Sequence, residues 1–251
     1  MKLAELLSIS GPKPISVLEE EQLKELQKAL SLLGYPVGEI DGLIGPKTRN
    51  AWSEYKTDVF LGNPVLIGKE SVGTLQEKLN DIGEGATHDF SSKAGTIEAI
   101  KKECRAQGIG LNTQIAYVLA TTQWETNQTF EPVREAYWLN EDWRKNNLGR
   151  YYPFYGRGFV QLTWKNNYEK YSRILDVDMV SDPEIAMRPN LALFVLVHGI
   201  KTGSFTGRKI TDYIDETKTD FVRARRCING NDKAHEIDDI AKRFLSDLVG
   251  M

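Results

Sequence analysis

The chain has 251 residues, a formal net charge of −3, and 41% hydrophobic and 27% charged residues. This composition is typical of a globular protein and excludes the collagen-like, low-complexity and intrinsically disordered classes. Acidic and basic residues are spread evenly, so the chain lacks the basic excess that concentrates a nucleic acid, and we expect no nucleic-acid partner. The longest apolar run, 191–197, is far shorter than the ~20 residues that cross a bilayer, which predicts no membrane insertion.

The N-terminal segment 1–14 lacks the features of a secretory signal. Glu5 interrupts its short apolar stretch, whereas a signal needs an apolar core of roughly 7–15 residues. We therefore expect synthesis in a cytoplasm without a signal peptide. The two cysteines, Cys104 and Cys227, have no C-x-x-C spacing and are predicted to be buried thiols.

Residues 17–56 read as a small helical unit. Leucines recur there at the spacing of one helical face. These leucines are Leu23, Leu26, Leu30 and Leu33. Gly34 is expected to end this helix, and Pro46 to occupy the first position of a second one.

The chain is expected to divide into a module at 1–68, a partly helical connector at 69–87 and a larger domain at 88–251. The connector is predicted from its many glycines. In the larger domain, apolar periodicity predicts several helices. The only sequence pattern typical of β-structure lies around 159–164. The expected helices cover 96–107, 112–126, 191–201 and about 232–248. The predicted fold class is therefore mainly α.

Glu125 is the first candidate for chemistry. Val118, Thr122 and Glu125 fall at i, i+4 and i+7 of the helix 113–126, so Glu125 extends an inward-facing row to the helix end. Partial desolvation there suits a general acid. The same residue also fits a last-turn glutamate that points to solvent.

A second acidic candidate follows in the segment 130–139, where Glu135 competes with the nearer Glu131. Two carboxylates on the rim of one groove are what glycosidic cleavage needs. Aromatic residues, on which sugar rings stack, are dense across 137–168. The alternative for these aromatic residues is a hydrophobic core beneath long loops.

Other catalytic and cofactor sites are not indicated. The three histidines, His88, His198 and His235, have no zinc-ligand spacing, and no G-x-S-x-G motif is present. Pro46 interrupts a short glycine-rich stretch that only faintly resembles a phosphate-binding loop. We therefore predict no metal and no cofactor.

Residues 23–55 resemble the small three-helix peptidoglycan-binding module in the order and spacing of their motifs. The matching positions are Leu26, Gln27, Leu30, Gly34, Tyr35, Asp41, Gly42, Gly45, Thr48 and Ala51. The resemblance implies that the module binds bacterial cell wall, with Tyr35, Asp41 and Thr48 as candidate binding residues. The residues alone also fit a simple turn between two helices, in which the glycines serve backbone geometry.

Three ordered segments in 113–247 resemble motifs of family 19 glycoside hydrolases, namely AYVLATTQWETN, YYPFYGRGFVQLTWKNNYEKYS and RRCINGNDKAHEIDDIAKRF. The resemblance implies a lysozyme-like α-helical catalytic domain. Glu125 matches the general acid of that family, and Glu135 matches the carboxylate that activates water for an inverting displacement. The implied substrate-binding residues are Tyr155, Arg157, Gln161, Asn167 and Asn229.

This chain departs from the family pattern at two points. Trp124 stands where a histidine usually precedes the acid, and only nine residues separate Glu125 from Glu135. The short gap resembles the phage endolysin branch, which implies a monomer that is made in the host cytoplasm, cleaves β-1,4 bonds of peptidoglycan in the periplasm and is released by a separate membrane-permeabilising protein. A chitinase on the same fold and a non-catalytic wall-binding protein are the alternatives.

Overall fold

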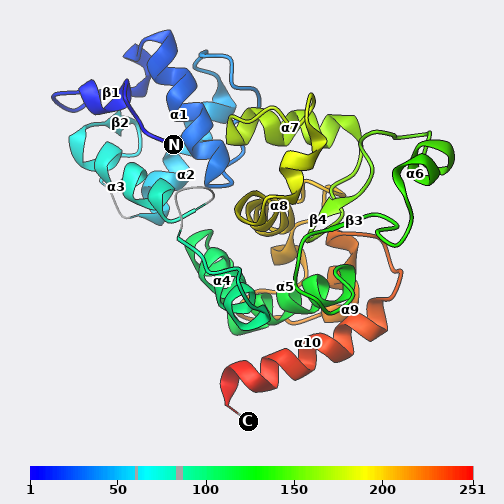
Figure 1. The fold of residues 1–251 in the computed structure, drawn as a ribbon. Helices are drawn as coiled ribbons and strands as arrows, with labels where there is room; N and C mark the ends of the chain where they lie inside the picture. The colour runs from blue at the N-terminus through cyan, green and yellow to red at the C-terminus, as the bar shows by residue number, and fades with distance from the viewer. Residues whose placement is uncertain (60–61, 83–86, 251) are drawn as a thin grey trace. The chain divides into compact units, whose positions relative to one another are not determined.

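The computed structural model describes residues 1–59, 62–82 and 87–250, and its fold is mainly α, as predicted (Figure 1). The chain forms two compact units, Met1–Gly85 and Ala86–Met251. Among the described residues, no helix has the length and apolar character needed to cross a membrane.

In its described residues, the first unit contains three α-helices, α1 (Glu20–Leu32), α2 (Pro46–Asp58) and α3 (Lys69–Asn80). Two short strands, β1 (Lys13–Pro14) and β2 (Leu66–Ile67), pair antiparallel. Two 3-10 turns precede α1, at Leu6–Ser8 and Ile15–Val17. Pro46 occupies the first turn of α2, where its missing N–H costs no hydrogen bond, as predicted.

The leucine face of α1 forms the centre of the first unit, which confirms the predicted helix. All four leucines of this face are buried. Trp52 and Tyr55 of α2 are fully buried as well. The helix ends next to Gly34, whose φ of +85° is the left-handed conformation that glycine adopts at low cost.

The segment that sequence analysis treats as a connector contributes a helix to the first unit. Helix α3 packs against α1 and the turn Leu6–Ser8. Its Gln76 side chain accepts a hydrogen bond from the Leu3 amide at 2.8 Å and donates one to the Met1 carbonyl at 2.9 Å. The boundary at residue 68 is therefore placed too early, because these tertiary contacts join α3 to the N-terminus. Residues 83–86 of the expected connector lie outside the described residues.

The second unit contains most of the helices. They are α4 (Lys93–Ala106), α5 (Asn112–Glu125), α6 (Glu141–Asn147), α7 (Lys165–Leu175), α8 (Pro189–Thr202), α9 (Phe221–Ala224) and α10 (Ala234–Val249). Short 3-10 turns cover Pro183–Met187, Ile210–Asp212 and Arg225–Cys227. The expected helices near 96, 112, 191 and 232 correspond to α4, α5, α8 and α10.

One short hairpin, β3 (Val133–Arg134) with β4 (Arg157–Gly158), lies in the second unit. The sequence predicts β-structure at 159–164, but β4 ends at Gly158. Beyond it, Leu162 forms an isolated β-bridge with Arg157. The hairpin brings together two segments that lie more than twenty residues apart in the chain.

Helices α5 and α8 form the core of the second unit. The residues from Ile115 to Ala120 are fully buried, and every residue from Leu191 to Ile200 is buried. Helix α10 packs along α5, and α4 contacts both α5 and α8 (Figure 1). Cys104 and Cys227 are free and buried, as predicted, and burial raises the pKa of the Cys227 thiol to about 12. Helix α5 is thus packed against α4, α8 and α10.

Candidate active site

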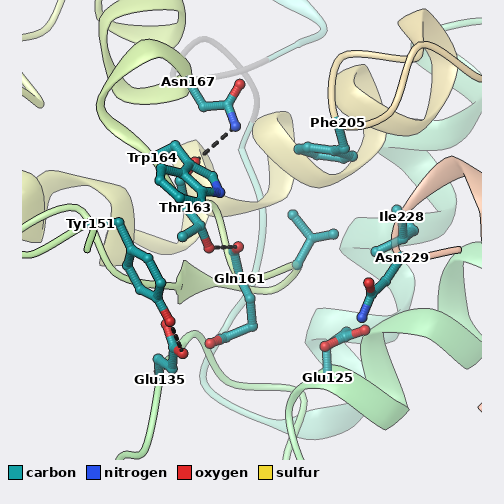
Figure 2. Close-up of a pocket in the computed structure, with 11 residues that line it drawn as sticks. Glu125, Glu135, Tyr151, Gln161, Thr163, Trp164, Asn167, Phe205, Ile228 and Asn229 are labelled. Carbon is teal, nitrogen blue, oxygen red and sulfur yellow. Dashed lines mark hydrogen bonds between the residues drawn. The ribbon is translucent and has the colours of Figure 1, made fainter. Parts of the chain in front are cut away.

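Glu125 and Glu135 line one cavity of about 460 Å³ in the second unit. Figure 2 shows the two carboxyl groups at this cavity on separate segments of the chain. The other lining residues are Tyr151, Val160, Gln161, Thr163, Trp164, Asn167, Phe205, Ile228 and Asn229. The cavity therefore combines two carboxyl groups, three side-chain amides and several apolar or aromatic faces.

Glu125 is the last residue of α5 and is held by an ion pair. Its Oε1 accepts a hydrogen bond from Arg225 at 2.7 Å, and 15% of its side chain is exposed. Arg225 is 2% exposed and also donates from Nε to the Asp232 carbonyl at 2.9 Å. The row from Val118 through Thr122 is buried, as predicted. The buried helix and the arginine together fix where the carboxylate sits.

Glu135 follows β3 and is held through both carboxylate oxygens. The Tyr151 hydroxyl donates to Oε1 at 2.7 Å, and the Gly156 amide donates to Oε2 at 2.9 Å. The Glu135 amide donates in turn to the Gly156 carbonyl at 2.7 Å. Burial and the neighbouring carboxylate raise the pKa of Tyr151 to about 12, so this hydroxyl stays protonated and keeps its donor proton even at alkaline pH.

The main chain at Glu135 is also anchored. Arg144 of α6, only 6% exposed, donates to the Glu135 carbonyl at 2.8 Å and to the Ala136 carbonyl at 3.0 Å. Its remaining nitrogen pairs with Glu141 at 3.2 Å. Glu135 is consequently fixed by main-chain and side-chain contacts, as preorganised chemistry requires.

Gln161, Asn167 and Asn229 all line the cavity. Gln161 donates to the Val133 carbonyl at 3.1 Å, and Asn167, in the first turn of α7, donates to the Thr163 carbonyl at 2.8 Å. Asn229 is exposed beside Glu125 (Figure 2). Gly156 gives Gln161 its space, because a Cβ there would lie 2.6 Å from Gln161 Oε1.

Aromatic faces form part of the cavity wall. The Tyr151 and Trp164 ring centroids lie 5.2 Å apart, and Trp164 is 44% exposed. The Arg150 guanidinium lies 5.3 Å from the Trp164 ring. Phe205 comes from the segment after α8 (Figure 2). Such exposed rings are suited to stacking on sugar rings.

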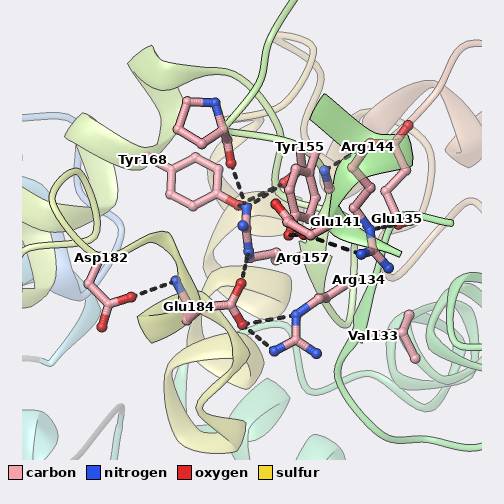
Figure 3. A network of polar contacts seen from close by, with 12 residues as sticks. Val133, Arg134, Glu135, Glu141, Arg144, Tyr155, Arg157, Tyr168, Asp182 and Glu184 are labelled. Atoms are coloured by element: carbon pink, nitrogen blue, oxygen red, sulfur yellow. Dashed lines mark hydrogen bonds and ion pairs between the residues drawn. The ribbon is translucent and has the colours of Figure 1, made fainter. Parts of the chain in front are cut away.

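Tyr155 and Arg157 do not line this cavity. They are 1% and 3% exposed, and they belong to a polar network that includes residues of the β3–β4 hairpin (Figure 3). The Tyr155 hydroxyl donates to Glu141 at 2.9 Å, while Arg157 pairs with Glu184 at 2.8 Å and donates to the Tyr168 hydroxyl at 3.1 Å. Both residues instead line a separate cavity of about 580 Å³, so they do not join Gln161, Asn167 and Asn229 at the two carboxyl groups.

Glu131 and Trp124 lie apart from the cavity lining. Glu131 is exposed, so of the two candidates for the second carboxylate only Glu135 lines the cavity. Trp124 is 36% exposed, and the Lys233 ammonium lies 6.0 Å from its ring.

In the first unit, two of the three candidate wall-binding residues, Asp41 and Thr48, are hydrogen-bonded to the buried Gln27. Gln27, 1% exposed, donates to Asp41 at 2.8 Å and to Thr48 at 3.2 Å. Thr48 is 2% exposed, so its assignment to wall binding is corrected to a structural role. The hydrogen bond from Gln27 and the Leu43 amide lower the pKa of Asp41. The half-buried Tyr35 donates to Asp58 at 2.8 Å.

Arg225 and Phe205 were missed by sequence analysis. Arg225 is one of three closely spaced arginines, and nothing in their local pattern shows which one is buried. For Phe205 the sequence offers one weak indication: Gly199 lies inside the apolar helix α8, and a glycine there indicates that another group packs closely on the helix. A Cβ at Gly199 would lie 2.0 Å from the Phe205 ring, so the ring packs directly on the helix backbone.

Across the described ranges, no cluster of three or more His, Cys, Asp or Glu side chains could hold a metal ion. His198 is buried in α8, with Nδ1 3.3 Å from the Tyr171 hydroxyl. The cavity itself presents two carboxyl groups, and groups of this kind can give and take protons.

No family model matches the chain, and no curated protein matches it. Among solved structures, chitinase C from Streptomyces griseus HUT6037 is similar to it, with a TM-score of 0.41 and 19% sequence identity. The match covers 56% of this chain and 60% of that chitinase.

Proposed function

We propose that the second unit hydrolyses β-1,4 glycosidic bonds between N-acetylmuramic acid and N-acetylglucosamine in peptidoglycan. One observation carries the proposal. Glu125 and Glu135 come from separate segments yet line one cavity, together with amide side chains and aromatic rings. Most glycoside hydrolases use a pair of carboxyl groups at the sugar-binding cavity, one as the general acid and one as the base or nucleophile.

In the proposed mechanism, the Glu125 carboxyl donates its proton to the glycosidic oxygen as the bond from that oxygen to the anomeric carbon breaks. Glu135 takes a proton from a water molecule whose oxygen bonds to the same carbon from the opposite face, which inverts its configuration. Tyr151 and Gly156 hold the Glu135 carboxylate in the orientation that this step needs. Exchange with solvent then restores both groups.

The choice of peptidoglycan over chitin rests on the first unit, whose motif order resembles a peptidoglycan-binding module. A wall-binding unit on the same chain raises the local concentration of the hydrolase at an insoluble polymer. We propose that the protein acts as an endolysin, a monomer made in the host cytoplasm that reaches the wall in the periplasm with the help of a separate membrane-permeabilising protein.

The test is mass spectrometry of fragments released from purified sacculi, after borohydride reduction marks the new reducing ends. We expect fragments that end in reduced N-acetylmuramic acid. Glu125→Gln and Glu135→Gln are each expected to lower release by about 10²–10⁴-fold, because each removes one proton-transfer group. Glu131→Gln is the matched control, since this exposed glutamate lies outside the cavity lining, and it is expected to retain activity.

Other outcomes separate the alternatives. Release from chitin oligomers but not from sacculi would indicate a chitinase. Binding to sacculi without release from either polymer would indicate a non-catalytic wall-binding protein. If Glu131→Gln abolished release while Glu135→Gln retained it, the second carboxylate would be wrongly assigned.

A further inference from the structure

A second cavity, of about 310 Å³, lies wholly within the first unit. Its lining residues are Ser10, Gly11, Pro12, Lys56, Asn63, Leu66, Ile67, Gly68, Lys69, Glu70 and Ser71. None of these is a residue that motif resemblance assigns to wall binding.

Lys56 is a buried cation whose loss of hydration is offset by few polar contacts. It is 6% exposed, and its ammonium donates to the Leu66 carbonyl at a long 3.3 Å and lies 5.6 Å from the Trp52 ring. Within residues 1–59, 62–82 and 87–250, no carboxylate forms an ion pair with it. Desolvation lowers the pKa of Lys56, and Glu70 only partly opposes this. A buried ammonium without a counterion is costly, so an anion beside it would be stabilised.

The first residues of α3 form another wall of the same cavity. Gly68 caps the helix, and Lys69, Glu70 and Ser71 are its first turn. First-turn amides have no acceptor within their own helix, and the helix dipole adds partial positive charge there. The buried Lys56 and this twelve-residue helix therefore favour an anion independently of each other.

The charges of the lining favour a single carboxylate over a phosphate dianion. Lys56 and Lys69 supply two positive charges and Glu70 one negative charge, so the lining has a net charge of +1. Much of the remaining wall consists of glycine or apolar residues, including Gly11, Pro12 and Leu66. Among the residues that the structure describes, this wall includes no aromatic side chain, and it therefore suits a short peptide end better than a sugar ring.

We propose that this cavity binds a carboxylate-bearing end of the peptidoglycan stem peptide, with Lys56 and the first turn of α3 as the carboxylate-binding groups. The inference rests on the wall-binding role proposed for the first unit. It names the part of the polymer that the unit recognises, and it places recognition away from the turn that holds Asp41 and Thr48.

The test is isothermal titration of the full chain with acetyl-L-Lys-D-Ala-D-Ala, once as the free acid and once as the C-terminal amide. We expect the amide to bind at least about tenfold more weakly, because it loses the charge-assisted hydrogen bonds. Lys56→Met is expected to weaken binding of the acid by a similar factor and to keep or raise the melting temperature, because it removes a buried charge.

Gly11→Val provides a second variant that does not touch Lys56. Gly11 lines the cavity, a Cβ there has no heavy atom within 4 Å, and its φ is not left-handed, so the valine variant is expected to stay folded and to obstruct binding. Lys78→Met is the matched control, because Lys78 is exposed at the other end of α3, and it is expected to bind like the wild type.

Equal binding of acid and amide, or no binding of the acid, would overturn the inference. Inorganic phosphate bound as tightly as the acid would assign the cavity to phosphate instead. Normal binding by Gly11→Val, with a lowered melting temperature in Lys56→Met, would make Lys56 purely structural. Fragment release from sacculi without peptide binding would defeat only this inference, whereas peptide binding without release would defeat only the proposed hydrolysis.

Discussion

The Arg225 guanidinium lies 2.7 Å from the Glu125 carboxylate, across 100 residues of sequence. Because Arg225 is only 2% exposed and also holds the Asp232 carbonyl, the pair ties the end of α5 to the segment that carries Asn229. Charge-assisted hydrogen bonds of this kind are shorter and stronger than neutral ones. The arginine is therefore a positioning residue for the proposed acid.

Arg225→Met is expected to lower both stability and turnover. It removes two hydrogen bonds of a buried guanidinium, which costs about 1–3 kcal/mol of the free energy of unfolding, and it frees the Glu125 side chain to rotate. Urea unfolding and the kcat for fragment release measure the two effects. Arg226→Met is the control, since the neighbouring Arg226 is exposed. Wild-type stability and kcat in Arg225→Met would contradict the positioning role.

Tyr151→Phe removes the hydroxyl that donates to Glu135 and is expected to lower kcat by about tenfold. Tyr213→Phe is the control, because it removes a hydroxyl from the same unit outside the cavity lining. An unchanged kcat in Tyr151→Phe would show that the Gly156 amide alone suffices to hold Glu135.

The Tyr151 hydroxyl also predicts a pH dependence of stability. Its pKa rises from an ordinary 10.0 to about 12 in the folded protein. A raised pKa means that its stabilising contribution is complete below about pH 10 and is lost as the pH rises through about 12. The difference in urea midpoint between wild type and Tyr151→Phe is therefore expected to stay constant from pH 7 to about 10 and to shrink above it. A difference that shrinks below pH 9 would disagree with this.

Gly156→Ala is expected to weaken substrate binding. The new methyl group would lie 2.6 Å from Gln161 Oε1 and 3.1 Å from Gln161 Cβ, so the side chain must move from its position in the cavity. Overpacking of this kind costs about 1–3 kcal/mol, and a rise in KM on soluble glycan fragments measures the displacement. Gly149→Ala is the control, because its Cβ makes only an ordinary contact at 3.8 Å. An unchanged KM would show that Gln161 does not bind the glycan.

Thr48→Val tests the structural role of Thr48 in the first unit. Loss of the acceptor for Gln27 is expected to lower the free energy of unfolding by about 1 kcal/mol, while binding of the folded protein to sacculi stays unchanged. The exposed Thr57 provides the control Thr57→Val. A selective loss of sacculus binding at wild-type stability would return Thr48 to the binding surface.

The position of Glu125 was predictable because it depends on one helix. The spacing from Val118 and Thr122 requires only local geometry, and α5 ends at Glu125 as that pattern indicates. Glu135 could be chosen over Glu131 only by motif resemblance, because its place in the cavity depends on β3 pairing with a strand far along the chain.

The burial of Tyr155 and Arg157 could not be predicted from composition. Their segment is rich in tyrosine, glycine and proline, which is typical of a surface loop. It enters the interior because its polar groups find partners in distant segments, including Glu184 and Tyr168. The place of α3 in the first unit was likewise hard to predict, because glycines flank this helix on both sides. It belongs to the unit through the hydrogen bonds of Gln76 with the N-terminal segment.

The β3–β4 hairpin has a consequence for protein engineering. It clamps both ends of the segment 136–155, so Glu135 keeps its place as long as Arg144 and Tyr151 are retained. The Trp138 side chain, 71% exposed, makes none of the contacts that hold Glu135. Position 138 is therefore a place where the side chain can be exchanged while Glu135 keeps its hydrogen bonds.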